Sequence, residues 1–303
     1  MQYIQGRFEE HARKFVESKN NVEERLKLVT SFRESIEIAH TSEYENFLKC
    51  LFPVFRNALR EGAPMYMECN EQKIRNVLLE ILNRLPNNEV LRPYVSDLLR
   101  LVMEILSIDN QENALICLRI IFDVHKNFSP KLETEVQPFI NFFINLYKNL
   151  PQTVQLVFSR QPNRIAIASD GTHVKVLCKS VESFKVLTEC PLIVMLLFQL
   201  YPGYVETNIH HLIPLMMRAL NIQPPTNLTQ QHSQLYSDFI AAQVKTLSFL
   251  TYVLRGFADR MHPHQDNLSK CVIQLLLNCP TSSINSRKEL LVATRHILAT
   301  NFR

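Results

Sequence analysis

Glycine is scarce in this sequence, with five residues among 303. Sandwiches and barrels need glycine in their many tight turns, and nucleotide-binding α/β folds need it in their phosphate loops. An all-helical chain fits this composition better. The hydrophobic share of 46% is ordinary for a folded protein, so the composition also excludes disorder over the whole chain.

Paired cysteines and long apolar runs are missing as well. The seven cysteines are scattered, and none belongs to a Cys-x-x-Cys pair. Because no secretory signal is found near Met1, we expect reduced thiols and an intracellular compartment. The longest apolar run, Pro191 to Phe198, is far shorter than the roughly 20 residues that span a membrane, so we expect no membrane contact.

Motifs for catalysis and cofactor binding are also absent. The chain has no Gly-x-x-x-x-Gly-Lys, Gly-x-Gly-x-x-Gly, Gly-x-Ser-x-Gly or His-Glu-x-x-His sequence. The nearest metal-ligand candidates are His210-His211 and His262-Pro263-His264, and each cluster offers at most two ligands where zinc needs three or four. We therefore expect no enzyme activity, cofactor, bound metal or small-molecule substrate.

The clearest helix in the sequence runs from Leu235 to Gly256. Its apolar residues recur every three or four positions, which predicts one continuous apolar stripe. Ser237 and Asp238 suit a helix start, and Gly256 suits a left-handed residue at the end. Such a stripe has to be covered by the helices before and after it.

Similar patterns predict helices along most of the chain, joined by short turns. Ser42 with Glu45, Asp109 with Glu112, and Ser286 with Glu289 have the spacing of helix-starting caps. Residues 3–38 are highly charged and are predicted to form a terminal, partly capping region. The other predicted helices cover residues 47–59, 73–85, 91–108, 114–128, 133–150, 184–201, 205–220, 265–278 and 287–302.

Two segments interrupt the helical pattern. Residues 159–183 predict a long, irregular surface loop that could hold short strands near 165–168 and 174–177, and residues 221–233 predict a shorter loop. The aromatic residues between Phe139 and Tyr147 predict a stripe that packs between helices.

Prolines indicate a repeat. Pro53, Pro93, Pro138, Pro214 and Pro263 are separated by 40, 45, 76 and 49 residues, and the longest gap contains the irregular loop. Two helices per 40 to 47 residues are typical of HEAT and armadillo units. We therefore predict an all-α fold, with residues 1–303 as a single α-solenoid segment of HEAT-like antiparallel helix pairs. A compact helical bundle is the alternative architecture. Pro53 and Pro214 lie deep enough to kink or break their helices.

Positive charge is concentrated at the C-terminal end. The net charge is +4 overall, whereas residues 240–303 hold eight Lys/Arg and three Asp/Glu, a difference of +5. This end is therefore the predicted docking face for an acidic partner, with Lys270, Arg287, Lys288 and Arg295 as the candidate contact residues. The alternative is a solvated basic face that binds nothing.

Five stretches carry a family resemblance. They are Ile81–Pro93, Glu112–Asp123, Ser183–Tyr201, Asp238–Tyr252 and Arg287–Leu298. Together they resemble the N-terminal HEAT-repeat region of the transformation/transcription domain-associated protein (TRRAP) family, and they span most of the chain in family order. None of the five is a catalytic signature.

The resemblance implies a nuclear scaffold. TRRAP-like proteins belong to the phosphatidylinositol 3-kinase-related group, have an inactive kinase domain, and present HEAT surfaces to transcription activators in histone acetyltransferase coactivator complexes such as SAGA. The FAT region and pseudokinase domain of the family have no counterpart in these 303 residues.

We therefore predict a non-catalytic interaction module whose partners are transcription activators and acetyltransferase-complex subunits. The alternative is nucleic-acid binding by the same basic end. Against it, basic and aromatic residues do not alternate as in a stacking groove, and the net charge is low for following phosphates.

Overall fold

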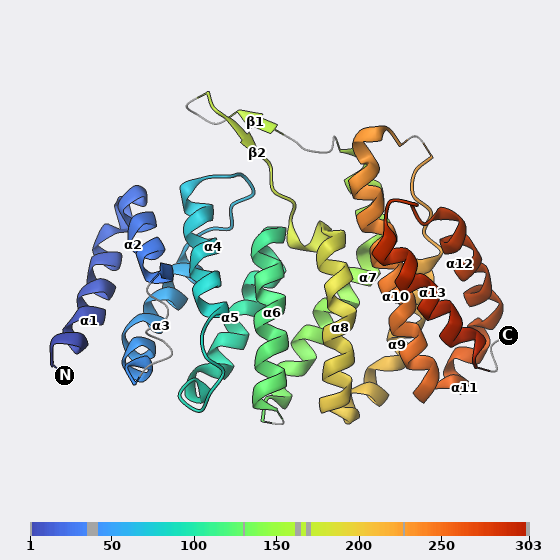
Figure 1. Ribbon diagram of the computed structural model, residues 1–303, viewed down its shortest axis with the longest axis horizontal. Coiled ribbons are helices and arrows are strands. Elements are labelled where there is room, and N and C mark those ends of the chain that lie inside the picture. The colour runs from blue at the N-terminus through green and yellow to red at the C-terminus, as the bar shows by residue number, and fades with distance from the viewer. Residues whose placement is uncertain are drawn as a thin grey trace. The chain divides into compact units, whose positions relative to one another are not determined.

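The computed structural model describes residues 2–34, 42–129, 131–160, 165–167, 171–226 and 228–300. These residues form thirteen α-helices and one two-stranded hairpin (Figure 1), which confirms the predicted all-α class. The helices are α1 (Gln2–Glu17), α2 (Val22–Glu34), α3 (Tyr44–Glu61), α4 (Asn70–Asn83), α5 (Val95–Ile108), α6 (Gln111–Phe128), α7 (Val136–Ser159), α8 (Phe184–Leu200), α9 (Pro202–Leu220), α10 (Ser233–Gly256), α11 (Ala258–Met261), α12 (Gln265–Asn278) and α13 (Ile284–Leu298). The strands are β1 (Ile165–Ile167) and β2 (His173–Lys175).

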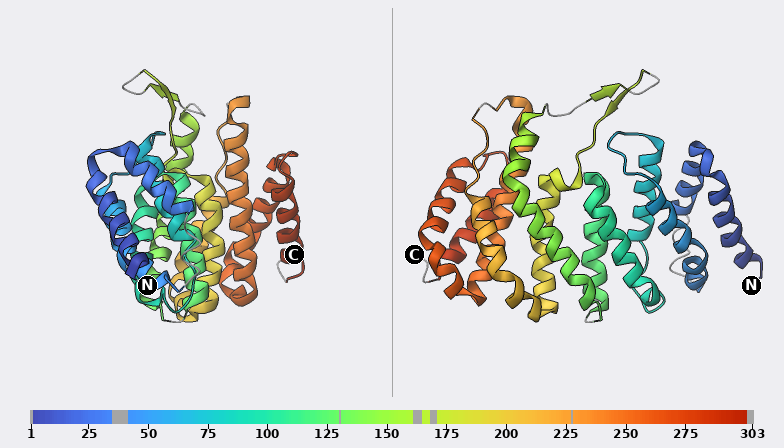
Figure 2. Two further views of the ribbon diagram at one scale, coloured as in Figure 1. Left: turned by 60° about the vertical axis from the view of Figure 1, so that its left-hand side comes forward. Right: turned by 180° about the vertical axis from the view of Figure 1, so that it is seen from behind.

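The helices form two compact units, each with two rows. The first unit comprises residues 1–135 and 163–181; α1, α3 and α5 contact one another along one row, and α2, α4 and α6 along the other. The second unit comprises residues 136–162 and 182–303, with α7, α9 and α12 in one row and α8, α10 and α13 in the other. Figure 2 shows the helix pairs of each unit stacked in chain order. The prediction that residues 1–303 make one solenoid segment stays a prediction.

Hydrogen bonds between neighbouring helix pairs reveal the repeat directly. The Tyr44 hydroxyl donates to the Pro86 carbonyl at 3.1 Å, and Tyr236 donates to Asn278 at 2.9 Å; both pairs are 42 residues apart. Other bonds of this kind join residues separated by 40 to 47 positions. The spacing agrees with the HEAT-like period that the prolines predicted.

The predicted stripes of 235–256 and 139–147 meet in the core of the second unit. Phe143 is fully buried, and its ring centroid lies 6.2 Å from that of Phe249 on α10. The buried hydroxyl of Tyr147 lies 2.7 Å from Thr246 Oγ1, so the ring packs while its polar tip is satisfied. The aromatic stripe of α7 therefore serves packing, as predicted.

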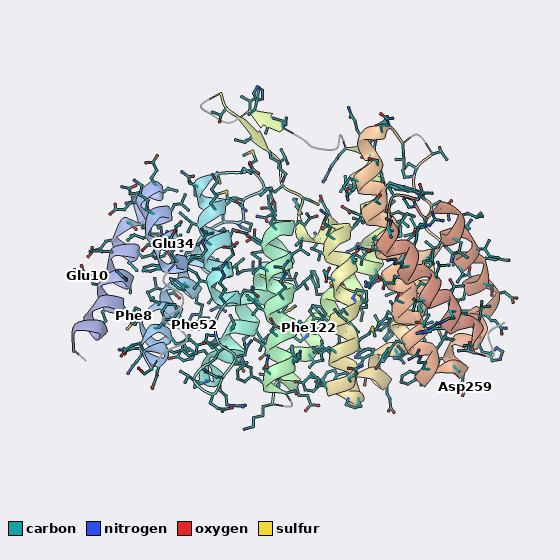
Figure 3. The ribbon with its side chains drawn as sticks, viewed as in Figure 1. Phe8, Glu10, Glu34, Phe52, Phe122 and Asp259 are labelled. Carbon is teal, nitrogen blue, oxygen red and sulfur yellow. The ribbon has the colours of Figure 1, made fainter. Side chains whose placement is uncertain are left out.

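Aromatic side chains also form the core beneath the first helix pair. Phe15 packs edge-on against Phe55, with ring centroids 6.3 Å apart, and Phe8 packs in the same way against Phe47 at 5.7 Å. Glu10 projects outward from α1 (Figure 3). The predicted capping region thus has one apolar face and one charged face; residues 35–38 of that prediction lie outside the described residues.

The start and end of α10 differ from the prediction. The helix begins at Ser233, directly after a short 3-10 turn in which Thr229 and His232 form a capping box. Ser237 and Asp238 therefore lie inside the helix. Gly256 is its last residue and does not adopt a left-handed conformation, which among described glycines is found at Gly171 with a φ of 81°.

The three predicted caps are also wrong, and in two of them a tertiary partner holds the carboxylate of Asp109 or Glu289. The N-cap of α6 is Asn110, whose side chain accepts a bond from the Asn113 amide at 3.1 Å. The neighbouring Asp109 carboxylate bonds to Arg75 instead.

At the start of α3 the N-cap position falls on Glu43, with no side-chain cap bond. Ser286 lies inside α13, and Glu289 accepts bonds from Lys245 Nζ and Ser248 Oγ, each at 2.9 Å.

Prolines do not break the helices that contain them. Pro53 and Pro214, which were predicted to kink or break their helices, lie inside the continuous helices α3 and α9. Helix α7, predicted to end at residue 150, continues through Pro151 to Ser159. An internal proline costs about 3 kcal/mol in a helix. Here the surrounding core offsets that cost, since Leu150, Val154 and Phe158 are all buried.

The predicted irregular loop contains an antiparallel hairpin and an extended strap, which we define as residues 176–180. In the hairpin Ile165 pairs with Lys175 and Ile167 with His173, and Figure 1 shows it standing clear of the helices of the first unit. The strap then runs along two interhelix turns. Leu177 N donates to Tyr66 O at 2.8 Å, and Gln111 N donates to Cys178 O at 2.7 Å.

A buried ion pair lies beside the strap. Arg75 donates from Nε and Nη2 to Asp109 Oδ2 at 2.9 and 2.6 Å, while its Nη1 donates to the carbonyls of Leu59 and Gly62. The second oxygen of Asp109 accepts from the Asn113 side chain at 3.0 Å. Since both charges are buried and fully hydrogen-bonded, the pair fixes the register between α4, the end of α5 and the start of α6.

Candidate interaction surface

The four predicted contact cations lie on the last two helices. Lys270 belongs to α12, and Arg287, Lys288 and Arg295 belong to α13. All four side chains are exposed, and none forms an ion pair with an acidic residue of the described chain. Three of the predicted residues therefore share one helix, and the fourth lies on the helix that contacts it.

The cations of α13 fall on one side of the helix. Lys288 and Arg295 are seven residues apart, which is close to two full turns, so they lie on one line along the helix. Arg287 lies beside this line. The opposite side of α13, with Leu290, Ala293 and Ile297 buried, forms the contact with the core.

An exposed aliphatic column, which was not among the predicted contacts, runs beside these cations. Ile284, Leu291 and Leu298 are again spaced by seven residues, and they are 62%, 60% and 58% exposed. The seven-residue spacing was visible in the sequence, but spacing alone does not distinguish an exposed column from the core-facing side of a helix. Further exposed aliphatic side chains on α12 and α13 are Ile273, Leu276, Leu277 and Val292.

The acidic residue of α13 is directed toward α10. Glu289, the acidic residue of α13, is held by Lys245 and Ser248 of α10. Burial raises the pKa of the nearby Cys279 thiol, and the positive charge of Arg287 opposes that rise. The exposed side of α13 therefore carries positive charge without a neutralising carboxylate of its own helix.

An open hollow of about 460 Å³ borders the start of α13. Its one charged lining residue, Asp238, accepts a bond from Gln234 at 2.8 Å and lies 3.9 Å from Lys185 Nζ. The lining combines this carboxylate with four serine side chains and includes no histidine, lysine or cysteine. The lining residues are Gln234, Ser237, Asp238, Ala241, Ser282, Ser283, Ile284, Asn285 and Ser286.

The histidine pair that was considered as a metal site lies on α9. The rings of His210 and His211 have centroids 3.9 Å apart. Across the described part of the chain, no three His, Cys, Asp or Glu side chains come together as a metal ion would need. Within the same residues, no helix combines the length and apolar character that crossing a bilayer requires.

The fold and this surface define an α-solenoid of HEAT-like helix pairs with an exposed basic and aliphatic face. The matching family model describes the Tra1 HEAT repeat central region and covers residues 235–303. The chain belongs to the TRRAP/Tra1 family, as the resemblance indicated. The resemblance was to the N-terminal repeats, whereas the matched model assigns residues 235–303 to the central region.

The chain is similar to proteins from several eukaryotes. The chain is 40% identical to a probable transcription-associated protein 1 of Dictyostelium discoideum over 98% of its length, and 34% identical to the transformation/transcription domain-associated protein of Homo sapiens over 93%. It is 28% identical over 97% to a Saccharomyces cerevisiae protein named as a SAGA complex/NuA4 acetyltransferase complex subunit. The chain spans only 8 to 9% of the length of these relatives.

Proposed function

We propose that the chain is a non-catalytic interaction module that acts in the nucleus as part of a histone acetyltransferase coactivator scaffold. The names of the yeast relatives, which describe subunits of SAGA and NuA4 acetyltransferase complexes, support this assignment. Its partners are then subunits of such a complex and the transcription activators that recruit it. The arrangement of paired helices suits this role, because stacked repeats present extended surfaces for other proteins.

The observation that carries the proposal is the set of exposed cations on α12 and α13. Acidic activation segments are the partners that this surface fits, with Lys270, Arg287, Lys288 and Arg295 as their contacts. An exposed ion pair contributes only about 0.2–1 kcal/mol, so these cations mainly attract and orient an acidic segment. Binding of this kind weakens as salt screens the charges.

The first test is direct binding of a labelled acidic activation segment, measured by fluorescence anisotropy. Reversing all four cations to glutamate should weaken binding by tenfold or more, which corresponds to roughly 1.4 kcal/mol. A matched variant reverses four exposed lysines on other helices and should bind almost normally; these are Lys49, Lys73, Lys126 and Lys148. Equal loss in both variants would show that net charge, rather than this surface, governs binding.

The same titration with a DNA duplex separates the two classes of partner. The proposal predicts weak DNA binding, with a small fall in affinity as salt rises. A steep salt dependence for DNA, absent for the acidic segment, would favour phosphate contacts and contradict the proposal.

Membership of a complex is tested by affinity capture of the tagged chain from nuclear extract, followed by mass spectrometry. Acetyltransferase-complex subunits should be enriched over a bait of unrelated sequence. Recovery of chaperones alone would contradict the proposal that this chain assembles into such a complex.

A further inference from the structure

The strap contacts the first unit largely through its backbone. Together with Lys175, which precedes it, the strap forms four backbone hydrogen bonds with the turn between α3 and α4 and the turn between α5 and α6. The bonds run from Leu177 N to Tyr66 O at 2.8 Å, from Glu68 N to Lys175 O at 3.1 Å, from Gln111 N to Cys178 O at 2.7 Å and from Ser180 N to Asp109 O at 2.9 Å. One short segment therefore connects two turns that are separated in the sequence by α4 and α5.

Few side chains of the strap are buried. Leu177 and Ser180 are buried, whereas Val176 and Cys178 are partly exposed and Lys179 is exposed. By contrast, α4, which follows the first of the two turns, buries six aliphatic side chains. A segment that buries little apolar surface opens at a lower free energy than the core helices beside it.

The Ser180 side chain weakens the attachment of the strap. The residue is fully buried, and its Oγ has no hydrogen-bond partner among the described residues. A buried hydroxyl without a partner has lost its hydrogen bonds to water, and it regains them when the segment opens. The closed strap is thus stabilised by Leu177 and four backbone bonds, and it is destabilised by this hydroxyl.

We infer that the strap is a conformational switch that opens as one unit while the helices of the first unit stay folded. The closed strap covers the backbone of both turns. In the open form the carbonyls of Tyr66 and Asp109 lose their bonds to the strap and face water. The amides of Glu68 and Gln111 do the same. Opening therefore changes which hydrogen-bonding groups the first unit presents at this edge, and it does so independently of the proposed role of α12 and α13.

Native-state hydrogen exchange of the full chain, resolved to single amides, tests the inference. We define the reporters as the four amides that donate across the contact, which are those of Glu68, Gln111, Leu177 and Ser180. The reporters should share one protection factor within about threefold, and they should exchange at least roughly a hundredfold faster than the core amides of α4 and α6. Mild urea should speed the exchange of the core amides but not of the reporters, because local opening exposes little surface.

Two substitutions in the strap should shift the opening in opposite directions. Leu177→Ala removes the buried aliphatic side chain, so the reporters should exchange faster by roughly tenfold or more. Ser180→Ala removes the unsatisfied hydroxyl, so the reporters should exchange more slowly by about threefold or more. Both effects are measured at Glu68 and Gln111, whose own residues are unchanged in these variants.

A matched control lies in the core of the first unit. Leu82 is buried near the end of α4 that is farther from the strap. Leu82→Ala destabilises the closed and open forms equally relative to the unfolded chain, so the core amides should exchange faster while the reporters stay unchanged. Ile167 on β1 is 71% exposed, and Ile167→Ala should change neither set of amides.

Several outcomes would overturn the inference. Reporters that are as strongly protected as the core amides, or that respond equally to urea or to Leu82→Ala, would show that the strap opens only when the whole unit unfolds. Reporters with widely different protection factors would show that the strap does not open as one unit. If the Leu177→Ala chain does not fold, Ser180→Ala and the urea dependence of the native chain still decide between these outcomes.

Discussion

Arg75 and Arg295 carry the same guanidinium group in opposite settings. The Arg75 side chain is 5% exposed, and each of its nitrogens donates to Asp109 or to a backbone carbonyl. Arg295 is exposed on α13 and pairs with no described carboxylate. The Arg75 charge is neutralised by an ion pair inside the fold, whereas the Arg295 charge faces solvent. Loss of charge should therefore affect stability in one region and binding in the other.

The largest expected effect is at the buried pair. Asp109→Ala leaves the Arg75 charge buried without its partner, which typically costs about 3–5 kcal/mol. We expect a loss of that size in the unfolding free energy from urea titration. Asp97→Ala, which removes the partly exposed carboxylate bound to Arg56, is the matched control and should cost less than about 1 kcal/mol.

If the Asp109→Ala chain does not fold, a double variant still tests the prediction. Replacing Arg75 by methionine and Asp109 by leucine together removes both buried charges, so it should recover much of the lost stability. Equal losses of unfolding free energy in Asp109→Ala and Asp97→Ala would contradict the prediction that burial makes the Arg75–Asp109 pair the more costly one to break.

A buried histidine that has to stay neutral should have a smaller effect on the unfolding free energy, and this effect depends on pH. His125 on α6 is 1% exposed, and burial lowers its pKa to about 4. Below about pH 6.5 the unfolded chain binds a proton that the folded chain does not, so stability falls with pH until the folded state also titrates near pH 4. Between pH 7 and pH 5 this residue should lower the unfolding free energy by roughly 2 kcal/mol.

The measurement is urea unfolding at both pH values for the native chain and for His125→Gln. The variant has no imidazole to protonate, so its stability should decrease less between the two pH values. An identical decrease in both proteins would show that other groups set the acid sensitivity.

The smallest effect belongs to a charge pair at the surface. Arg60 donates to both oxygens of Glu104 at 2.9 Å, yet the two side chains are 40% and 51% exposed. Glu104→Gln should cost only about 0.2–1 kcal/mol, and the difference should shrink in high salt. Thermal melts at low and high ionic strength measure it. A loss as large as that of Asp109→Ala would show that exposure does not separate these pairs.

Local sequence patterns predicted the helices well because each helix buries a stripe that is visible in the sequence. The stripe of α10 and the aromatic residues of α7 became core, and the spacing of prolines agreed with the distance between bonded repeats. The candidate cations were found by charge alone, and the structure places them on exposed positions of α12 and α13. Their role as contacts stays a prediction.

Long-range partners explain what the sequence did not predict. Asp109 and Glu289 have the spacing of capping residues, but their carboxylates bond to Arg75 and Lys245, which are 34 and 44 positions away. Pro151 is typical of a helix end, but the burial of neighbouring side chains stabilises α7 beyond this proline. The aliphatic column of α13 was missed because an apolar residue on a helix is usually assigned to the core, and only exposure separates the two cases.

Because of the strap, neither unit is a continuous stretch of the sequence. Residues 176–180 belong to the first unit but come after α7, so the polypeptide begins the second unit before it has completed the first. A chain ending at Glu135 would keep α1 to α6 yet lack the segment that bonds to the backbone of Tyr66, Asp109 and Gln111. During synthesis, the first six helices are complete before the strap has been made, and the strap can bond to their turns only about 50 residues later.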